Sequence, residues 1–293
     1  MMHKKPIVVT GASGFIGSNL ATLLTEMNYR VIGINKKYDD NAFYEIITYE
    51  KFIQDLYDPS VFEDVVCVFN IANTYDSSNK NCISQDFLNS NLILPLKLAE
   101  VFAKKSIPII LPGSYLQSRK IFDSEKRFSL YVSLKNYVET VYDEYEQNLG
   151  LQYIRTRQYE SYGKGDTRPR LLNRLVDHLR NEKTISKVSH DFELDYIHVL
   201  DLCRGYIEIL KLVERQTLKS GSIVELSTRK YVKYSELLIL LQDLLKTNFV
   251  HENGILNFDA KDVQSLNETA SWPLGWEPKI ELKTGLREMF LEV

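Results

Sequence analysis

Apolar positions in the first half of the chain follow two alternating spacings. Short, nearly continuous apolar runs favour strands covered on both faces, and they occupy residues 7–9, 30–34, 45–49, 65–71, 107–111 and 152–157. Between them, apolar residues recur every three or four positions, which predicts helices over residues 16–27, 91–104 and 130–148. Gly150 suits a cap at the end of the last helix. Strands and helices that take turns predict right-handed crossovers and a parallel sheet.

The rhythm changes after about Tyr162. Here the pattern predicts helices over 171–180, within 199–213 and over 234–246, a strand over 221–226 and a short final helix. Because no low-complexity linker separates the halves, the boundary between them is soft. The fold we expect is α/β, with a Rossmann-like doubly wound parallel sheet and a smaller C-terminal lobe over the mouth of the sheet.

Three glycines follow the first predicted strand and open the first predicted helix, with the spacing G-x-x-G-x-x-G. The first glycine permits a tight turn, the second lets the backbone approach a pyrophosphate, and the third lets the helix pack close to the sheet. The N–H groups at the start of the helix then attract the anion. A plain glycine-rich turn is the alternative, but this position favours a dinucleotide site made by Gly11, Ser13, Gly14, Phe15, Ile16 and Gly17.

The end of the second strand should meet the adenosine ribose, where an NAD enzyme usually has an acid. This chain has Asn35 there, followed by Lys36 and Lys37. An amide removes the repulsion that a carboxylate exerts on a 2′-phosphate, and lysines pair with phosphate. We therefore favour NADP(H) over NAD(H); the alternative is that both lysines face water.

Tyr131 and Lys135 are four residues apart in a predicted helix, so both side chains lie on one face. A neighbouring ammonium favours the phenolate of a tyrosine, which prepares it for proton exchange. This pattern is common by chance among 18 tyrosines, and Tyr131 is selected because its helix follows the fifth strand. Ser114, just after that strand, would hold a substrate oxygen against Tyr131. The alternative for Ser114 is a turn residue.

The strings from Thr10 to Gly17 and from Tyr131 to Lys135 resemble the extended short-chain dehydrogenase/reductase family, also described as NAD-dependent epimerases and dehydratases. The resemblance covers nearly the whole chain, through Leu274–Pro278 near its end. It implies residues 1–162 as a dinucleotide-binding Rossmann domain, to which residues 199–246 partly return, and residues 163–293 mainly as a substrate-binding lobe. It also implies further cofactor contacts at Asp55, Leu56, Ile71, Ala72 and Asn91.

Several residues depart from the family pattern. Asn70 and Asn73 replace a histidine and an alanine beside the cofactor, Glu160 replaces an asparagine, and Leu194 replaces an arginine. Tyr115 and Leu116 stand where the family's dehydratases have an Asp-Glu pair, which argues against water elimination.

Within the family, the short length and the brief gap between Ser114 and Tyr131 resemble CDP-abequose and CDP-paratose synthases. This implies NADPH-dependent reduction of the C4 ketone of a nucleotide-linked 4-keto-6-deoxyhexose, in deoxysugar and lipopolysaccharide biosynthesis. The implied substrate residues are Tyr75, Ser114, Tyr115, Arg168, Arg170 and Arg174. For each arginine a solvated surface is the alternative. An NAD-dependent 4-epimerase and a non-catalytic dinucleotide sensor remain as alternative functions.

Composition and residue spacing argue against several classes of partner and ligand. The net charge of -3 argues against nucleic-acid binding. The cysteines and histidines lack metal-ligand spacing, and for His198 we favour packing over ligation. We see no leader and no apolar run of roughly 20 residues, so we expect a soluble cytoplasmic protein with no membrane partner. The tyrosine-rich helix 130–148 and the helix 91–104 resemble the family's dimer surface, which implies a homodimer.

Overall fold

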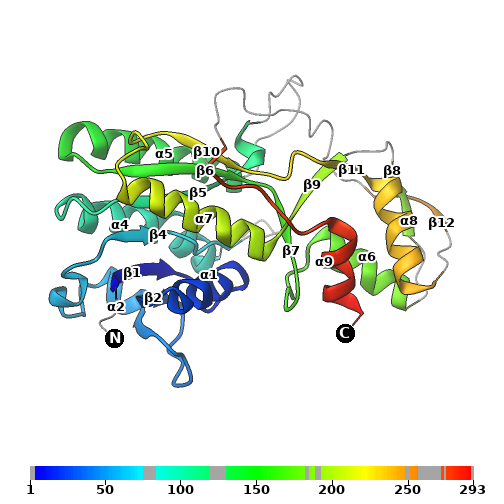
Figure 1. Cartoon of the computed structure of the whole chain (residues 1–293), viewed down its shortest axis with the longest axis horizontal. Helices are drawn as coiled ribbons and strands as arrows, with labels where there is room; N and C mark the ends of the chain where they lie inside the picture. Colours follow the sequence, from blue (N-terminus) through cyan, green and yellow to red (C-terminus); the bar gives the residue numbers. More distant parts are fainter. Residues whose placement is uncertain are drawn as a thin grey trace.

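The computed structural model describes residues 4–74, 84–118, 130–181, 185–188, 193–247, 251–256, 272–273 and 275–291. The molecule has a large lobe built on one sheet and a small lobe of helices and short strands beside it (Figure 1). The chain begins in the large lobe, and its last helix lies in the small one.

The large lobe is built on a seven-stranded sheet with the order β10-β6-β5-β4-β1-β2-β3. All its pairings are parallel. Its strands are β1 (Lys4–Thr10), β2 (Tyr29–Asn35), β3 (Glu45–Thr48), β4 (Cys67–Phe69), β5 (Ile109–Ser114), β6 (Tyr153–Gln158) and β10 (Ile223–Leu226). The chain order reverses on the two sides of β1, so the predicted doubly wound sheet is confirmed.

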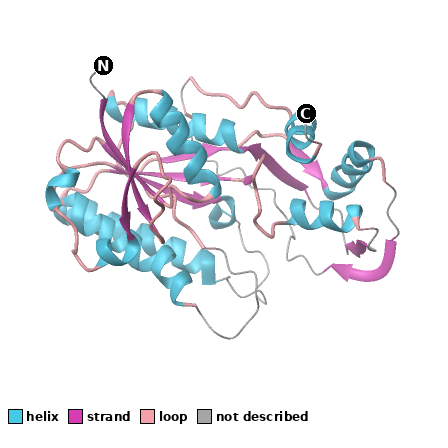
Figure 2. Ribbon diagram, turned by 90° about the horizontal axis from the view of Figure 1, so that it is seen from below, coloured by secondary structure: helices cyan, strands magenta, loops and turns pink. Residues whose placement is uncertain are grey.

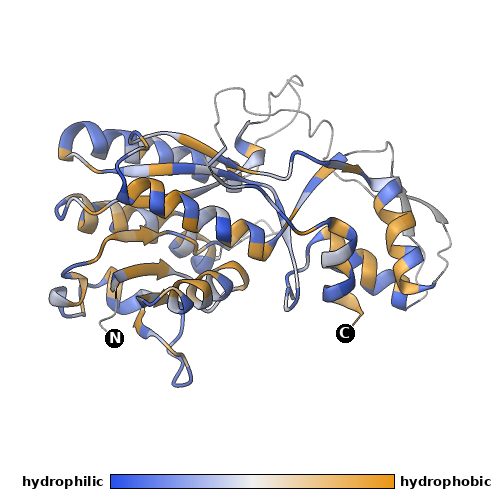
Figure 3. Ribbon diagram, in the orientation of Figure 1, coloured by the Kyte–Doolittle hydropathy of each residue, from blue (hydrophilic) through white to orange (hydrophobic). Residues whose placement is uncertain are grey.

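Helices cover both faces of this sheet (Figure 2). One core packs α1 (Phe15–Glu26) and α7 (Val199–Glu214) against the sheet. The other core packs α2 (Tyr49–Ile53), α4 (Leu94–Ala103) and α5 (Leu130–Leu149) against the opposite face. Figure 3 shows apolar colour along β4 and along the middle of β1, where Ile7–Val9 lie, as expected for strand segments buried on both faces.

The small lobe has its own core, formed by α6 (Leu171–Arg180), α8 (Tyr234–Leu245) and α9 (Leu282–Phe290). Beside them lies a sheet with the order β11-β9-β7, from β7 (Glu160–Tyr162), β9 (Glu193–His198) and β11 (Tyr231–Lys233). β8 (Ile185–Val188) pairs with β12 (His251–Leu256). Within residues 199–246, α7 and β10 therefore pack in the large lobe and α8 in the small one.

The helix predicted over 91–104 is interrupted in the structure. It begins earlier as α3 (Gln85–Leu88), widens into the π-helical turn η2 (Asn89–Ile93) and continues as α4. Pro95 explains the widening, because proline has no N–H to donate and its ring crowds the carbonyl one turn before it. Residue 49, predicted as strand, instead begins α2, whose N-cap Thr48 accepts a hydrogen bond from the Lys51 N–H.

Two 3-10 helices were not predicted either. They are η1 (Pro59–Phe62) and η3 (Tyr115–Ser118). The second one matters for the site, because it follows β5 directly and carries Tyr115 into the space between the lobes.

Candidate active site

The glycine loop between β1 and α1 forms a close-packed cradle. Gly11 has a φ of +64°, and a Cβ added at Gly17 would lie 2.0 Å from the Gly11 carbonyl oxygen. Gly14 is the N-cap of α1 and, as a glycine, has no side chain to occupy the N–H groups of the first turn. Ser13 and Gly14 are exposed. A loop this tight with open helix N–H groups fits the pyrophosphate of a dinucleotide.

Asn35 lies fully buried at the end of β2. Its Oδ1 accepts from the Ser13 N–H at 3.4 Å, and its Nδ2 donates to the Tyr44 hydroxyl at 3.2 Å. Lys36 is exposed and pairs with Asp86 at 2.5 Å, and Lys37 is exposed. The neutral Asn35 amide is thus tied to the cradle, and both lysines face the solvent beside it.

The other predicted cofactor residues differ in how far they are exposed. Asp55 is exposed and pairs with Lys97 at 2.7 Å, and Leu56 is 62% exposed. Ile71 and Ala72 come two and three residues after the end of β4, and Ala72 is buried against Gly11.

Asn91 is buried in the π-helical turn. Its Nδ2 donates to the carbonyl oxygens of Thr74, at 2.7 Å, and Phe87, at 2.9 Å. Its Oδ1 is buried and has no hydrogen-bond partner among the described residues. Asn91 therefore holds the segment after β4 in place, and one buried acceptor remains.

Ser114 ends β5, and Tyr131 and Lys135 lie on the first turns of α5; all three are buried. The Lys135 Nζ donates to the Pro112 carbonyl at 2.9 Å and lies 5.8 Å from the centre of the Tyr131 ring. Burial lowers the pKa of Lys135 to about 8, with Glu139 opposing the shift and Arg157 adding to it. The Asn73 Nδ2 donates to the Tyr131 hydroxyl at 3.1 Å. Ser114 and Tyr131 line one pocket, and Lys135 lies one helical turn from Tyr131.

A buried ion pair lies beneath these residues. Arg157 on β6 donates to both carboxylate oxygens of Glu139, at 2.6 and 2.9 Å. The Gln117 amide donates to Glu139 at 3.0 Å and accepts from the Ser114 N–H at 2.8 Å. The backbone of Ser114 is therefore linked through Gln117 to a two-point ion pair that joins α5 to β6.

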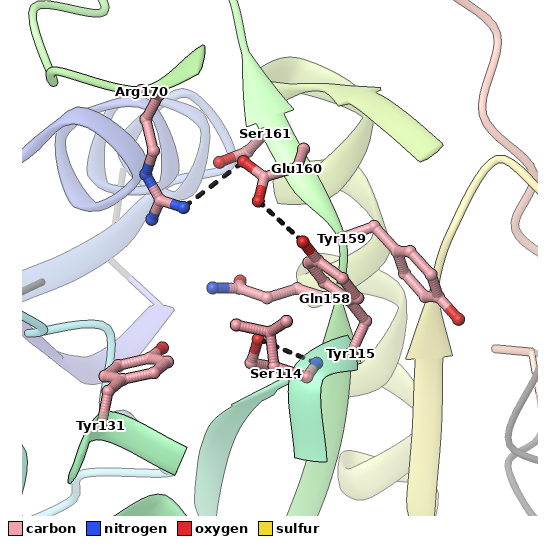
Figure 4. Close-up of a pocket in the computed structure, with 9 residues that line it drawn as sticks. Ser114, Tyr115, Tyr131, Gln158, Tyr159, Glu160, Ser161 and Arg170 are labelled. Carbon is pink, nitrogen blue, oxygen red and sulfur yellow. Dashed lines mark hydrogen bonds and ion pairs between the residues drawn. The ribbon is translucent and has the colours of Figure 1, made fainter. Parts of the chain in front are cut away.

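The pocket opens between the two lobes (Figure 4). Its lining residues are Ser114, Tyr115, Leu116, Tyr131, Gln158, Tyr159, Glu160, Ser161 and Arg170. The Glu160 carboxylate accepts from the Tyr115 hydroxyl at 3.1 Å and pairs with Arg170 at 3.3 Å. Tyr115 also stacks on Tyr159, with ring centres 5.2 Å apart. One wall thus carries hydroxyl groups and the opposite wall carries a carboxylate with its arginine.

Gln158 was missed by the sequence reasoning. Its Oε1 accepts from the Tyr206 hydroxyl at 2.8 Å, so its amide nitrogen faces the other way. Figure 4 shows that end of the side chain pointing between Arg170 and Tyr131. Its position two residues before Glu160, inside a segment that resembles a family motif, is the signal that could have found it.

The predicted substrate residues lie in different places. Ser114, Tyr115 and Arg170 line the pocket. Arg168 instead pairs with Asp166 at 2.7 Å and lies over the Phe15 ring at 4.4 Å, so it connects the small lobe to the cradle. Arg174 is exposed on α6 and is not one of the lining residues. Tyr75 lies outside the described residues.

His198 and two cysteines have packing roles. The His198 ring is the N-cap of α7 and accepts from the Leu200 N–H at 3.3 Å, and burial lowers its pKa. Cys67 and Cys203 are buried free thiols, and burial raises the pKa of each. The described residues include no acid, histidine or cysteine cluster suited to a metal ion. None of the described helices combines the length and apolarity that crossing a membrane requires.

Residues 7–221 match the model of a family described as the NAD dependent epimerase/dehydratase family. The chain belongs to this family. The resemblance to extended short-chain dehydrogenases/reductases is therefore confirmed, and the cradle and the pair Tyr131 and Lys135 lie within the matched residues.

Among curated family members, the chain is 22% identical to a CDP-abequose synthase of Salmonella typhimurium over 299 residues, 98% of this chain and 97% of that protein. It is 25% identical to a putative UDP-glucose 4-epimerase of Methanocaldococcus jannaschii over 315 residues, covering 97% and 96% of the two chains.

Solved structures show the same fold. A UDP-glucose 4-epimerase of Thermotoga maritima with UDP-glucose has a TM-score of 0.75 at 20% identity, covering 96% of each chain. A UDP-N-acetylglucosamine 4-epimerase of Methanobrevibacter ruminantium has a TM-score of 0.76 at 18% identity, covering 98% of this chain and 97% of the other. These likenesses extend over both lobes.

Proposed function

We propose that the protein reduces the C4 ketone of a nucleotide-linked 4-keto-6-deoxyhexose with NADPH. The observation that carries this proposal is the pocket shared by Ser114 and Tyr131, with the buried Lys135 one helical turn below. Both hydroxyls suit a carbonyl oxygen as hydrogen-bond donors. The curated relatives named CDP-abequose synthase support a deoxysugar substrate.

In this mechanism the chain's residues bind the ketone and supply one proton. Ser114 donates a hydrogen bond to the ketone oxygen and holds it beside the Tyr131 hydroxyl. A bound dinucleotide would supply the hydride to C4. As negative charge grows on the oxygen, Tyr131 gives it a proton, and the positive charge of Lys135 stabilises the phenolate left behind.

NADPH is our proposed cofactor because of the charges at the end of β2. Asn35 is neutral and buried, so it places no negative charge near a 2′-phosphate. Lys36 and Lys37 are both exposed, where they are able to meet that phosphate. The cradle from Gly11 to Gly17 would hold the pyrophosphate.

A nucleotide-diphosphate sugar is the proposed substrate. Solved relatives are described with UDP-glucose and with UDP-glucuronic acid, which supports this class. Arg170 on the small-lobe wall supplies positive charge, and the Gln158 amide at the end of β6 supplies an N–H donor. Tyr75, Arg168 and Arg174 remain candidates for other parts of the same ligand.

We further propose a cytoplasmic homodimer. Large apolar side chains are exposed at Ile93, at 36%, and on α5 at Leu130, Tyr137 and Leu149, at 43%, 53% and 54%. Pairing of these helices between two copies would cover them. Light scattering at micromolar protein should give the mass of two chains, and the mass of one chain would contradict the dimer.

The first experiment is titration of the purified protein with NADPH and NADH, followed by CDP- and dTDP-linked 4-keto-6-deoxyglucose. We expect tighter binding of NADPH and loss of reduced-nicotinamide absorbance when the correct keto sugar is added. The double variant Lys36→Ala/Lys37→Ala should weaken NADPH by about tenfold and leave NADH unchanged. Lys51→Ala, on α2, is the matched control. Equal weakening of both cofactors would contradict the assigned role of the lysines.

A second candidate is an NAD-dependent 4-epimerase, and the pairing of Lys36 with Asp86 favours it. A lysine already held by a carboxylate attracts a 2′-phosphate less strongly. This function predicts a protein purified with bound NAD that interconverts sugar epimers without net consumption of cofactor. A non-catalytic sensor is disfavoured, because a binding module has no need of Ser114, Tyr131 and Lys135 together.

A further inference from the structure

Asn73 stands where the family usually has an alanine, and its amide reaches the Tyr131 hydroxyl. The Asn73 Nδ2 donates to the Tyr131 oxygen at 3.1 Å. Lys135, by contrast, donates its Nζ proton to the Pro112 carbonyl at 2.9 Å. The Lys135 ammonium lies 5.8 Å from the centre of the Tyr131 ring as a nearby charge, and Asn73 donates a hydrogen bond directly to the Tyr131 oxygen.

The backbone before Asn73 is anchored to the cradle strand. The Ala72 N–H donates to the Thr10 hydroxyl at 2.9 Å, and that hydroxyl donates to the Asn70 Oδ1 at 3.1 Å. Thr10, Asn70 and Ala72 are all buried. Asn70 is the other asparagine that departs from the family pattern. Through Thr10 it helps to fix the backbone of Ala72, the residue before Asn73.

The backbone after Asn73 is anchored to the π-helical turn η2. The Asn91 Nδ2 donates to the Thr74 carbonyl at 2.7 Å, and the Ser90 hydroxyl donates to the Thr74 hydroxyl at 2.9 Å. Residue 73 is therefore held on both sides by buried polar groups of two different elements. An exposed side chain on a loop does not usually receive such support, and here that support directs an amide at Tyr131.

We propose that Asn73 is a positioning residue that donates a hydrogen bond to Tyr131 and stabilises the phenolate formed when Tyr131 gives up its proton. This inference rests on the proposed role of Tyr131 as proton donor. In the step, a C–H bond forms at C4 with the hydride that a bound NADPH would supply on becoming NADP⁺, and the Tyr131 O–H bond breaks as a new O–H bond forms on the sugar. The Asn73 N–H then faces an anion, and hydrogen bonds to ions are stronger than bonds to neutral groups.

The test follows the ionisation of Tyr131 without any sugar. Tyrosinate absorbance is titrated in matched pairs, the protein against Tyr131→Phe and Asn73→Ala against Asn73→Ala/Tyr131→Phe, so that each difference reports Tyr131 alone. We expect Asn73→Ala to move the Tyr131 titration to higher pH by roughly 0.5 to 1 unit, because a donor to the anion is lost. Asn73→Asp should move it further, because a carboxylate repels the phenolate.

Asn148→Asp is the control for added charge, since Asn148 is exposed near the far end of α5. It should leave the titration unchanged. If Asn73→Ala overlays the unsubstituted protein, or if Asn148→Asp shifts the midpoint as much as Asn73→Asp, the inference is wrong.

With a keto sugar that turns over, the high-pH limb of kcat/KM should move upward with the titration, because reduction needs the protonated tyrosine. A purely structural role would lower activity without moving that limb. If no sugar is reduced but the titration still shifts, the proposed function fails and the inference about Asn73 stands.

Discussion

The two walls of the pocket are made differently. On the large-lobe wall, Ser114 and Tyr131 extend from the end of β5 and the start of α5, and Lys135 lies behind them. On the small-lobe wall, Glu160 and Arg170 pair with each other across a 3.3 Å gap. The first wall presents neutral hydroxyls supported by buried charge, whereas the second presents the charges themselves.

This difference separates chemistry from recognition. The ion pair of the large-lobe wall, Arg157 and Glu139, is buried beneath the hydroxyls, and neither residue is among those that line the pocket. The ion pair of the small-lobe wall lines the pocket, so a ligand that uses Arg170 must compete with Glu160. We therefore expect damage to the first wall to lower the rate or the stability, and damage to the second to change affinity.

The largest expected effect is that of Tyr131→Phe. Removing the proton donor should lower kcat by about 10²- to 10⁴-fold, with little change in melting temperature. Tyr137→Phe, on the exposed side of the same helix, is the matched control and should keep full activity. Steady-state kinetics with the keto sugar measures both. Activity of Tyr131→Phe close to that of the control would remove Tyr131 from the mechanism.

Next in size is Glu139→Ala. It leaves Arg157 buried without its carboxylate, and breaking a buried pair in this way costs about 3–5 kcal/mol of unfolding free energy. Urea unfolding measures the loss. Glu281→Ala breaks the exposed pair with Lys230 and should cause no measurable change. Similar losses in the two variants would mean that the buried pair has no special role.

Lys135 predicts a pH dependence of stability. Its pKa is about 8 in the folded protein against an ordinary 10.5, so below about pH 8 the folded state holds a buried charge at a cost. Between these values the unfolded chain keeps a proton that the folded state has released, and stability rises with pH. Lys135→Met buries no charge at this position, so it should be more stable than the unsubstituted protein at neutral pH.

The extra stability of Lys135→Met over the unsubstituted protein should shrink by about 2 kcal/mol between about pH 7 and about pH 10. Unfolding of both proteins across this range measures the difference. A constant difference would show that Lys135 keeps its ordinary pKa in the fold.

The smallest effect belongs to the small-lobe wall. Arg170→Met should raise KM by about tenfold with kcat nearly unchanged, because the arginine binds ligand away from the reacting atoms. Arg30→Met, exposed at the start of β2, is the control. A fall in kcat without a change in KM would instead show that Arg170 acts in the chemical step, as we expect of the large-lobe wall.

The large-lobe wall was also easier to predict from the sequence than the small-lobe wall. The strands of the large sheet, its long helices and the positions of Gly11, Ser114 and Tyr131 could be predicted, because each depends on spacing within one element or one turn, whereas the short helix α2 could not. The π-helical turn at Asn89–Ile93 could not be predicted, because a proline near the start of a helix is also compatible with a regular α-helix.

The small-lobe wall depends on pairings between distant segments. Strands of three residues, such as β7 and β11, carry too little periodicity to predict, and they form only because β9 pairs with both. Glu160, the first residue of β7, enters the pocket through this arrangement. Asn73 was visible as a departure, but its contact with Tyr131 joins the end of β4 to α5, 58 positions along the chain.

The path of the chain between the lobes determines whether either lobe can fold without the other. It passes from β6 in the large sheet to β7 in the small one, returns through β9 to α7, leaves again from β10 to β11, and crosses once more between Trp276 and α9. A lobe cut from such a chain would lose strands or core residues that belong to its neighbour. We therefore expect the two lobes to unfold together as one cooperative unit. New specificity would have to be engineered residue by residue within the cleft, since an exchange of whole lobes would break both cores.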